Sequence, residues 1–70
     1  MSEPTLHVLI NQTPYALPIG ATLADAVQRA GVQPPFAAAV NLQFVPRGQY
    51  TQHLLADNDQ IELISPITGG

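Results

Sequence analysis

Two hydrophobic runs near the start of the chain predict a β-hairpin. The first run, Leu6–Ile10, is rich in residues that favour strands, and Tyr15–Leu17 forms the second. Asn11–Pro14 lies between them and supplies polar and turn-forming residues, as expected for a hairpin with a short polar turn. Pro18 and Gly20 follow, so we expect the second strand to end there.

The next residues predict one short amphipathic helix over Leu23–Ala30. Thr22 is a favourable N-cap, and Asp25 places a carboxylate near the positive end of the helix. Gly31 suits a left-handed C-cap, and Pro34-Pro35 prevents the helix from continuing. The apolar residues that recur at helical spacing form one stripe: Leu23, Ala26, Val27 and Ala30.

The second half of the chain predicts a further hairpin and a final strand. Ala37–Asn41 and Gln43–Val45 are two short extended runs, and Pro46 and Gly48 stop the second of them. The segment Tyr50–Leu55 is compatible with a single helical turn or with a coil that inserts Leu54 or Leu55 into the core.

The last strand is predicted over Gln60–Ser65, after the turn Asp57-Asn58-Asp59 and before Pro66. Side chains alternate along a strand, so Ile61 and Leu63 share one face. The other face then carries Gln60, Glu62 and Ile64.

This order of elements predicts an α+β fold over one domain, residues 1–70, with one helix packed across a mixed sheet of four to five strands. In such a β-grasp arrangement the first and last strands lie side by side at the centre of the sheet. The core is then expected to pair the helix stripe with inward residues of these two strands, namely Leu23, Val27 and Ala30 with Val8, Ile61 and Leu63. Ile67–Gly70 is expected to form a flexible C-terminal tail.

The charge inventory excludes several classes of function. The chain is 46% hydrophobic and 10% charged, with a formal net charge of −3. Its cations are Arg29 and Arg47, too few to neutralise a row of phosphates, so we expect no nucleic-acid binding. No apolar run approaches the roughly 20 residues of a membrane span and no signal-peptide pattern is present, so we expect no membrane partner and a cytoplasmic location.

The chain also lacks the equipment of a stand-alone enzyme. It contains no cysteine, which excludes disulfides and thiolate metal sites. His7 and His53 are isolated and interpreted as surface residues, and the two serines, Ser2 and Ser65, have no histidine nearby in sequence. The acidic residues near the last strand lack the pattern of a calcium loop and are interpreted as a solvated turn: Asp57, Asp59 and Glu62. We therefore expect no metal site and no bound cofactor.

The end of the sequence carries the one unusual chemical feature, Gly69-Gly70. An unperturbed α-carboxyl group has a pKa of about 3.3–3.7, so it is ionised at neutral pH and can attack the α-phosphate of ATP. Glycine has no Cβ, which lets an extended backbone enter a slot too narrow for other residues. We therefore predict that Gly70 is the reacting residue and that Ile67, Thr68 and Gly69 contact the partner.

Three apolar residues are left over once the core is assigned: Leu9, Phe44 and Ile64. They fall on or beside the outward phase of their strands, so we expect an exposed patch on the outer face of the sheet. Patches of this kind usually mark a protein interface. We therefore predict that these residues also contact the partner.

Together, these features resemble the sulfur carrier proteins of thiamine biosynthesis, the ThiS family. The resemblance rests on the order of elements, on Val40–Arg47 with its Val-Pro-Arg ending, on the turn Leu55–Asp59 and on the terminal Gly69-Gly70. It covers essentially the whole chain. The family's usual glycine within the Asp-Gly-Asp turn is replaced by Asn58, which also tolerates a left-handed conformation.

The resemblance implies a ubiquitin-like β-grasp fold and a carrier role. An ATP-dependent, E1-like adenylyltransferase would adenylate Gly70, and a cysteine desulfurase or rhodanese-type donor would supply sulfur to form a thiocarboxylate. Thiazole synthase would then take that sulfur. ATP would be used by the activating partner, and this chain would be a co-substrate rather than an enzyme.

Three alternatives stay open at the level of sequence. The small subunit of molybdopterin synthase shares the Gly-Gly ending but tends to be longer and lacks the Val-Pro-Arg segment. A ubiquitin-like modifier would be conjugated to other proteins through Gly70. A plain interaction domain would have no use for the ending at all.

Overall fold

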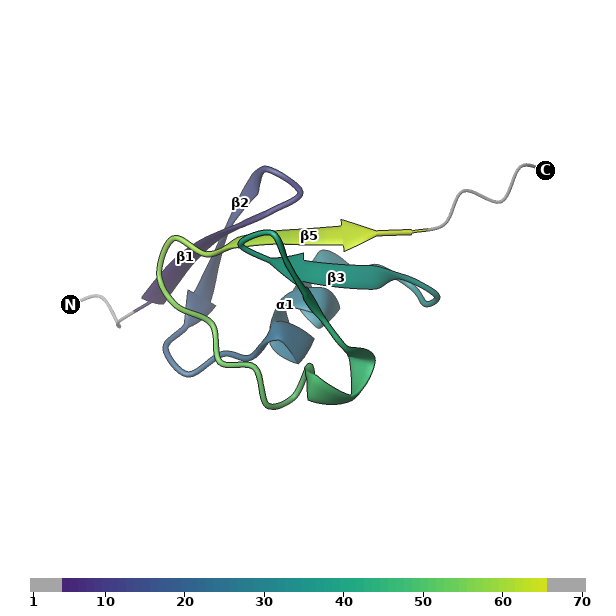
Figure 1. Cartoon of the computed structure of the whole chain (residues 1–70). Helices are drawn as coiled ribbons and strands as arrows, with labels where there is room; N and C mark the ends of the chain where they lie inside the picture. Colours follow the sequence, from purple (N-terminus) through teal and green to yellow (C-terminus); the bar gives the residue numbers. More distant parts are fainter. Residues whose placement is uncertain (1–4, 66–70) are drawn as a thin grey trace.

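The computed structural model describes residues 5–65 and consists of a mixed five-stranded sheet with one helix packed across it (Figure 1). The elements follow one another in the order β1 (Thr5–Ile10), β2 (Thr13–Pro18), α1 (Leu23–Ala30), β3 (Ala37–Val40), β4 (Gln43–Val45), the 3-10 turn η1 (Arg47–Gln49) and β5 (Gln60–Ile64). The predicted tail Ile67–Gly70 lies outside the described residues.

The sheet has the strand order β2-β1-β5-β3-β4. β1 and β5 pair in parallel at its centre, with Leu9 opposite Gln60 and Ile10 opposite Ile61. The other neighbouring strands are antiparallel. The first and last strands therefore lie side by side, and the predicted α+β, β-grasp fold is confirmed.

Both hairpins turn on two residues in left-handed backbone conformations. Asn11 and Gln12 have φ values of 51° and 69°, and Asn41 and Leu42 have 52° and 71°. Two consecutive positive φ angles are the mark of the tight turns that match the twist of a hairpin, and Asn is one of the residues that tolerate them. The predicted four-residue turn Asn11–Pro14 is therefore wrong, because β2 already begins at Thr13.

The other strand ends differ from their predicted positions by small amounts. β2 extends through Pro18, since proline is tolerated in an edge strand where its missing N–H faces outward. β3 ends at Val40 rather than Asn41, and β5 ends at Ile64 rather than Ser65.

The helix α1 has the predicted bounds, because both of its ends are specified locally. At its start, the Thr22 side chain accepts from the Asp25 N–H while the Asp25 carboxylate accepts from the Thr22 N–H, which forms a capping box. At its end, Gly31 adopts a left-handed conformation with a φ of 76°. Within residues 5–65, no helix is long and apolar enough to cross a membrane.

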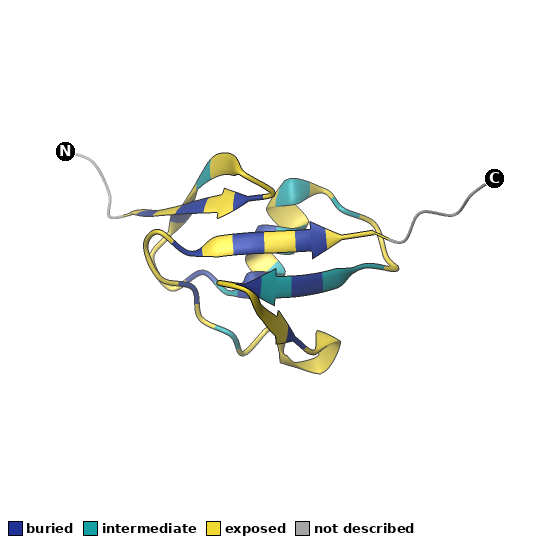
Figure 2. Cartoon of the chain, turned by 45° about the horizontal axis from the view of Figure 1, so that its top comes forward, coloured by how far each residue is buried: buried dark blue, intermediate teal, exposed yellow. Residues whose placement is uncertain are grey.

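The core lies between α1 and the inner face of the sheet. Along β5, buried residues alternate with exposed ones, as the alternating colours of the strand in Figure 2 show. Leu23 and Ala26 are fully buried, whereas Val27 and Ala30 are only partly buried and pack at the edge of the core. The predicted sheet side of the core is confirmed, since Val8, Ile61 and Leu63 are all buried.

The segment between β4 and β5 contains one feature that the sequence did not predict and one that it left undecided. The η1 turn was not predicted. Farther on, Leu54 forms an isolated β-bridge with Thr22 and remains exposed, whereas Leu55 is buried. Of the two predicted possibilities for Tyr50–Leu55, the structure therefore adopts the coil that inserts Leu55 into the core.

Candidate functional site

The residues Leu63, Ile64 and Ser65 form the candidate site within the described part of the chain, because they lead to the segment that ends in Gly70. Leu63 is buried, while Ile64 and Ser65 are exposed. On the β3 side, Ile64 lies opposite Ala37 in the last antiparallel pair of the sheet.

On the β1 side, a side chain holds this end of β5. β1 ends at Ile10, and the backbone then turns away at Asn11. The Leu63 N–H donates to Asn11 Oδ1 over 2.9 Å, and Asn11 Nδ2 donates to the Leu63 carbonyl over 3.2 Å. Asn11 thus binds both backbone polar groups of Leu63, and we call this pair of hydrogen bonds the Asn11 clamp.

The start of β5 is held by a second asparagine in the same turn position. The Gln60 N–H donates to Asn41 Oδ1 over 3.0 Å, and Asn41 Nδ2 donates to Asp59 Oδ1 over 3.0 Å. The other carboxylate oxygen of Asp59 accepts from the Ala56 N–H over 2.8 Å. We call these contacts the Asn41 clamp.

The prediction that all three acids near β5 belong to a solvated turn is wrong for Asp59. Asp59 is only 8% exposed, and among residues 5–65 it is the polar residue that is buried. Both of its carboxylate oxygens have hydrogen-bond donors, which offsets the cost of removing the charge from water. Asp57 and Glu62 are exposed, as predicted.

The three predicted partner residues that lie within residues 5–65 are exposed, but they do not form one patch. The other three, Ile67, Thr68 and Gly69, lie outside the described residues. Leu9 is 36% exposed, Phe44 69% and Ile64 59%. Phe44 lies opposite Ala39 and Ile64 opposite Ala37, so the two large side chains flank a floor of small alanines at the end of the sheet where β5 finishes. We call these four residues the β4–β5 patch.

Leu9 lies apart from the β4–β5 patch on the other side of β5. Its neighbours in the sheet are Pro14 on β2 and Gln60 on β5. The polar side chains of Gln60 and Glu62 occupy the outward positions of β5 between Leu9 and Phe44. The structure therefore brings Phe44 and Ile64 to one apolar region and leaves Leu9 in another.

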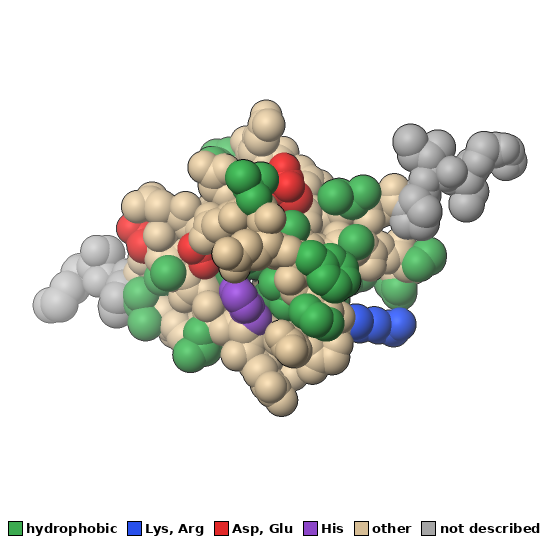
Figure 3. Space-filling model, viewed as in Figure 1, with side chains coloured by type: hydrophobic (Ala, Val, Ile, Leu, Met, Phe, Trp, Pro, Cys, Tyr) green, Lys and Arg blue, Asp and Glu red, His purple; other side chains and the backbone are tan. Residues whose placement is uncertain are grey.

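The β4 edge carries a further exposed apolar residue that the sequence reasoning missed. Leu42, in the turn before β4, is 85% exposed. The view from this side shows hydrophobic side chains gathered over the β4 edge (Figure 3). The signal for Leu42 in the sequence was that a large aliphatic residue stands at a turn position, where polar residues are usual.

Within residues 5–65, neither histidine belongs to a cluster of side chains that could act as a catalytic or metal site. The His7 side chain is 72% exposed and lies 3.6 Å from the Asp57 carboxylate, while the His7 N–H donates to the same carboxylate. His53 is half-buried in the loop before β5. Among residues 5–65, no group of three or more metal-ligating side chains comes together.

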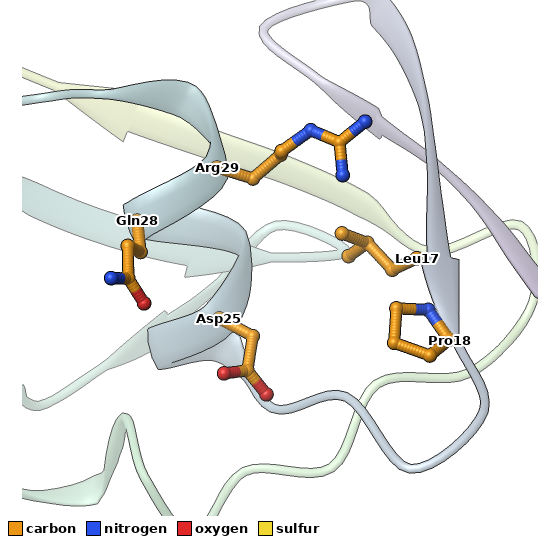
Figure 4. Close-up of a pocket in the computed structure, with 5 residues that line it drawn as sticks. All are labelled: Leu17, Pro18, Asp25, Gln28 and Arg29. Atoms are coloured by element: carbon orange, nitrogen blue, oxygen red, sulfur yellow. The ribbon is translucent and has the colours of Figure 1, made fainter.

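A groove between α1 and β2 is one of the concave features that polar side chains line (Figure 4). Leu17 and Pro18 line it from β2, and Arg29 extends toward them from the helix. Asp25 also lines it, but its carboxylate is occupied by the capping box. The groove therefore presents no free acid–base pair.

The contacts of the two asparagines with β5 were not predicted, although the sequence contained a signal for them. Each follows the last hydrophobic residue of a strand, in Ile10-Asn11 and in Val40-Asn41. A turn asparagine at the end of a strand next to the central strand can continue the ladder with its side chain. That signal could be interpreted only once the strand order was known.

Comparisons with known proteins agree with this geometry. The model of the ThiS family matches residues 8–70. The sulfur carrier protein ThiS of Escherichia coli (strain K12) is 35% identical over 66 residues, which cover 93% of this chain and all of that protein.

A solved structure gives the same fold. The crystal structure of a thiamine biosynthesis protein (ThiS) from Geobacter metallireducens matches with a TM-score of 0.76 at 14% sequence identity, covering 93% of this chain and 100% of that chain. Of the two pathways that the sequence left open, these matches favour thiamine biosynthesis over that of the molybdenum cofactor.

Proposed function

The chain belongs to the ThiS family of sulfur carrier proteins in thiamine biosynthesis, and on that premise we propose that it carries sulfur on the carboxyl group of Gly70. The observation that supports this assignment is that the family match extends through Gly69-Gly70. The full length of the Escherichia coli carrier is also covered. In this role the chain is a co-substrate of partner enzymes rather than an enzyme itself.

In the first proposed step, a carboxylate oxygen of Gly70 attacks the α-phosphorus of ATP. The bond to pyrophosphate breaks, and the products are an acyl adenylate on Gly70 and free pyrophosphate. The ATP is held by an E1-like adenylyltransferase, since the described residues offer no phosphate-binding loop. We propose a cytoplasmic setting because this step consumes ATP.

In the second proposed step, the terminal sulfur of a persulfide on a cysteine desulfurase or rhodanese-type donor displaces AMP from the acyl adenylate and forms an acyl disulfide with Gly70. A thiol then attacks the donor's sulfur atom and breaks the S–S bond, so that the donor leaves as a disulfide and a thiocarboxylate remains on Gly70. Thiocarboxylate sulfur is a good nucleophile, so the carrier has only to deliver it into the pocket of thiazole synthase. The carrier therefore needs an accessible terminus and a docking surface rather than a catalytic pocket.

The β4–β5 patch is the docking surface that we propose for the activating partner. Phe44 and Ile64 are large and exposed, and the alanines between them allow a partner side chain to approach the sheet closely. The patch lies at the end of the sheet from which the chain continues toward Gly70. A partner that holds the carboxyl group of Gly70 is thus close to this patch. We propose Leu9 as a separate contact.

Two variants of the terminus test the carrier role. Adding one residue after Gly70 moves the carboxylate about 3.5 Å along an extended chain, which is too far for attack on a fixed phosphate. Gly69→Val leaves the carboxylate in place but adds a branched side chain inside the proposed slot of the partner. We expect both variants to abolish ATP–pyrophosphate exchange by the adenylyltransferase.

The melting temperature of the same variants is the control. Both changes lie outside residues 5–65, which contain the described core, so we expect each to alter the free energy of unfolding by no more than about 0.5 kcal/mol and both variants to melt like the parent. Full exchange activity in either one would contradict the proposal and would favour an interaction domain.

A further inference from the structure

We propose that Asn11 is a positioning residue, whose side chain fixes the end of β5 and thereby the direction in which the chain leaves the sheet toward Gly70. The proposal rests on the proposed function, because positioning matters only if Gly70 must reach a partner's active site. It assigns a role to a residue of the first hairpin that is 52 positions away from Leu63 in the sequence.

The hydrogen bonds along β5 show that the Asn11 clamp continues the ladder between β1 and β5. The Leu9 N–H donates to the Asp59 carbonyl over 3.0 Å, and the Asn11 N–H donates to the Ile61 carbonyl over 2.9 Å. At the next step of a regular parallel ladder, the N–H and the carbonyl of Leu63 would both bind backbone groups. The backbone has already turned away, and the Asn11 side chain supplies both partners instead.

Asparagine is well suited to this position for two independent reasons. Its side-chain amide has one carbonyl oxygen and an NH2 group, so it can replace a peptide group as acceptor and donor at once. It also tolerates the φ of 51° that the hairpin turn requires. Glycine meets only the second requirement, and aspartate lacks the donor.

The clamp determines how much of the chain must be ordered when a partner binds the terminus. With Leu63 held on the β1 side and Ile64 paired to Ala37 on the β3 side, the strand is fixed up to that pair. Without the clamp, this end of β5 is bound on one side only and frays more often. Each extra residue that must be ordered in the complex lowers the fraction of docked carriers whose carboxylate is in place.

The chain provides a matched control for this proposal. Asn41 occupies the same turn position as Asn11, with a φ of 52°, and it also binds the backbone of β5 with its side-chain amide. It acts at Gln60, the start of the strand, rather than at Leu63. The pair Asn11→Gly and Asn41→Gly therefore removes one side-chain amide from each end of β5, while glycine preserves both turns. Asn41→Gly also removes the donor to the buried Asp59 carboxylate, which Asn11→Gly leaves in place.

The experiment measures amide hydrogen exchange and ATP–pyrophosphate exchange with the adenylyltransferase, at a temperature where all variants are fully folded. In Asn11→Gly we expect exchange of the Leu63 amide to rise about tenfold. We expect its kcat for pyrophosphate exchange to fall about tenfold with little change in KM, because the docking patch is intact. Asn41→Gly is expected to keep the Leu63 amide protected and kcat close to that of the parent.

Two results would overturn the positioning role. The first is an unchanged kcat in Asn11→Gly, and the second is an equal loss of kcat in Asn41→Gly, which would show that any weakening of β5 has the same effect. A parent chain without exchange activity would overturn the proposed function itself. In that case the hydrogen exchange of the Leu63 amide still tests the Asn11 clamp by itself. Faster exchange in Asn11→Gly supports the clamp, and unchanged exchange overturns it.

Discussion

The two ends of β5 are held by the same device but in different surroundings. At the start, the Asn41 clamp includes the buried Asp59, whose carboxylate also binds the Ala56 N–H. At the end, the Asn11 clamp consists of a single exposed side chain bound to Leu63. The start of the strand is therefore tied into a network, while the end depends on two hydrogen bonds and on the pairing with β3.

The difference indicates how one strand can serve both the fold and the proposed function. A satisfied buried network specifies the structure strongly, since the loss of one member leaves the others unpaired. A lone clamp near the surface can direct the chain without contributing much to the free energy of unfolding. We therefore expect variants at the start of β5 to affect stability first, and variants at its end to affect activity first.

Asp59→Ala is expected to cause the largest loss of stability, about 2 to 4 kcal/mol, because it leaves Asn41 Nδ2 and the Ala56 N–H without an acceptor. Denaturant unfolding measures the change. Asp57→Ala is the matched control, since it removes an exposed carboxylate from the same turn and is expected to cost about 1 kcal/mol or less. Equal losses in the two variants would show that the buried network is not what holds the start of β5.

Ile64→Ser and Leu9→Ser compare the two ends of β5 on the outer face of the sheet. Ile64 lies at the end of β5 and Leu9 beside its start, and each should change the free energy of unfolding by about 1 kcal/mol or less because neither is buried. We expect Ile64→Ser to raise the KM of the carrier for the adenylyltransferase about tenfold, with kcat unchanged. Leu9→Ser should have the smaller effect, because Leu9 lies beside Gln60 at the start of β5, away from the end of the strand at Ile64.

Titration of each variant with the adenylyltransferase would check this ranking directly. A larger loss of affinity in Leu9→Ser than in Ile64→Ser would remove the β4–β5 patch from the proposal and move the docking surface toward β2. Phe44→Ser provides a second measurement on the same patch and is expected to follow Ile64→Ser.

The fold was predictable from the sequence wherever the determinants are local. The bounds of α1 follow from Thr22, Asp25 and Gly31, which lie within or beside the helix itself. The end of β3 was predicted one residue too late, at Asn41, because its positive φ angle places it in the turn although it continues a hydrophobic run. The start of β2 was predicted at Tyr15 rather than Thr13, because the turn needs only Asn11 and Gln12. The exposure of Leu9, Phe44 and Ile64 followed from strand alternation, whereas their division into two regions required the strand order.

The candidate site was less accessible to sequence reasoning because its contacts join distant parts of the chain. Asn41 binds the Asp59 side chain across 18 positions, so nothing near Asp59 in the sequence indicated that it would be buried. Asn11 binds Leu63 across 52 positions. The predicted reacting residue, Gly70, lies outside the described residues, and its role depends on the family match and on experiment.

The intact mass of the chain after reaction is the most direct test of the carrier role. The chain is incubated with the adenylyltransferase, ATP and a sulfur donor, and is then analysed by mass spectrometry together with the variant that has a residue added after Gly70. We predict a form of the parent that is heavier by the difference between sulfur and oxygen, located on Gly70 and absent from the variant. A parent chain recovered only as the carboxylate, or sulfur found on any other residue, would contradict the account.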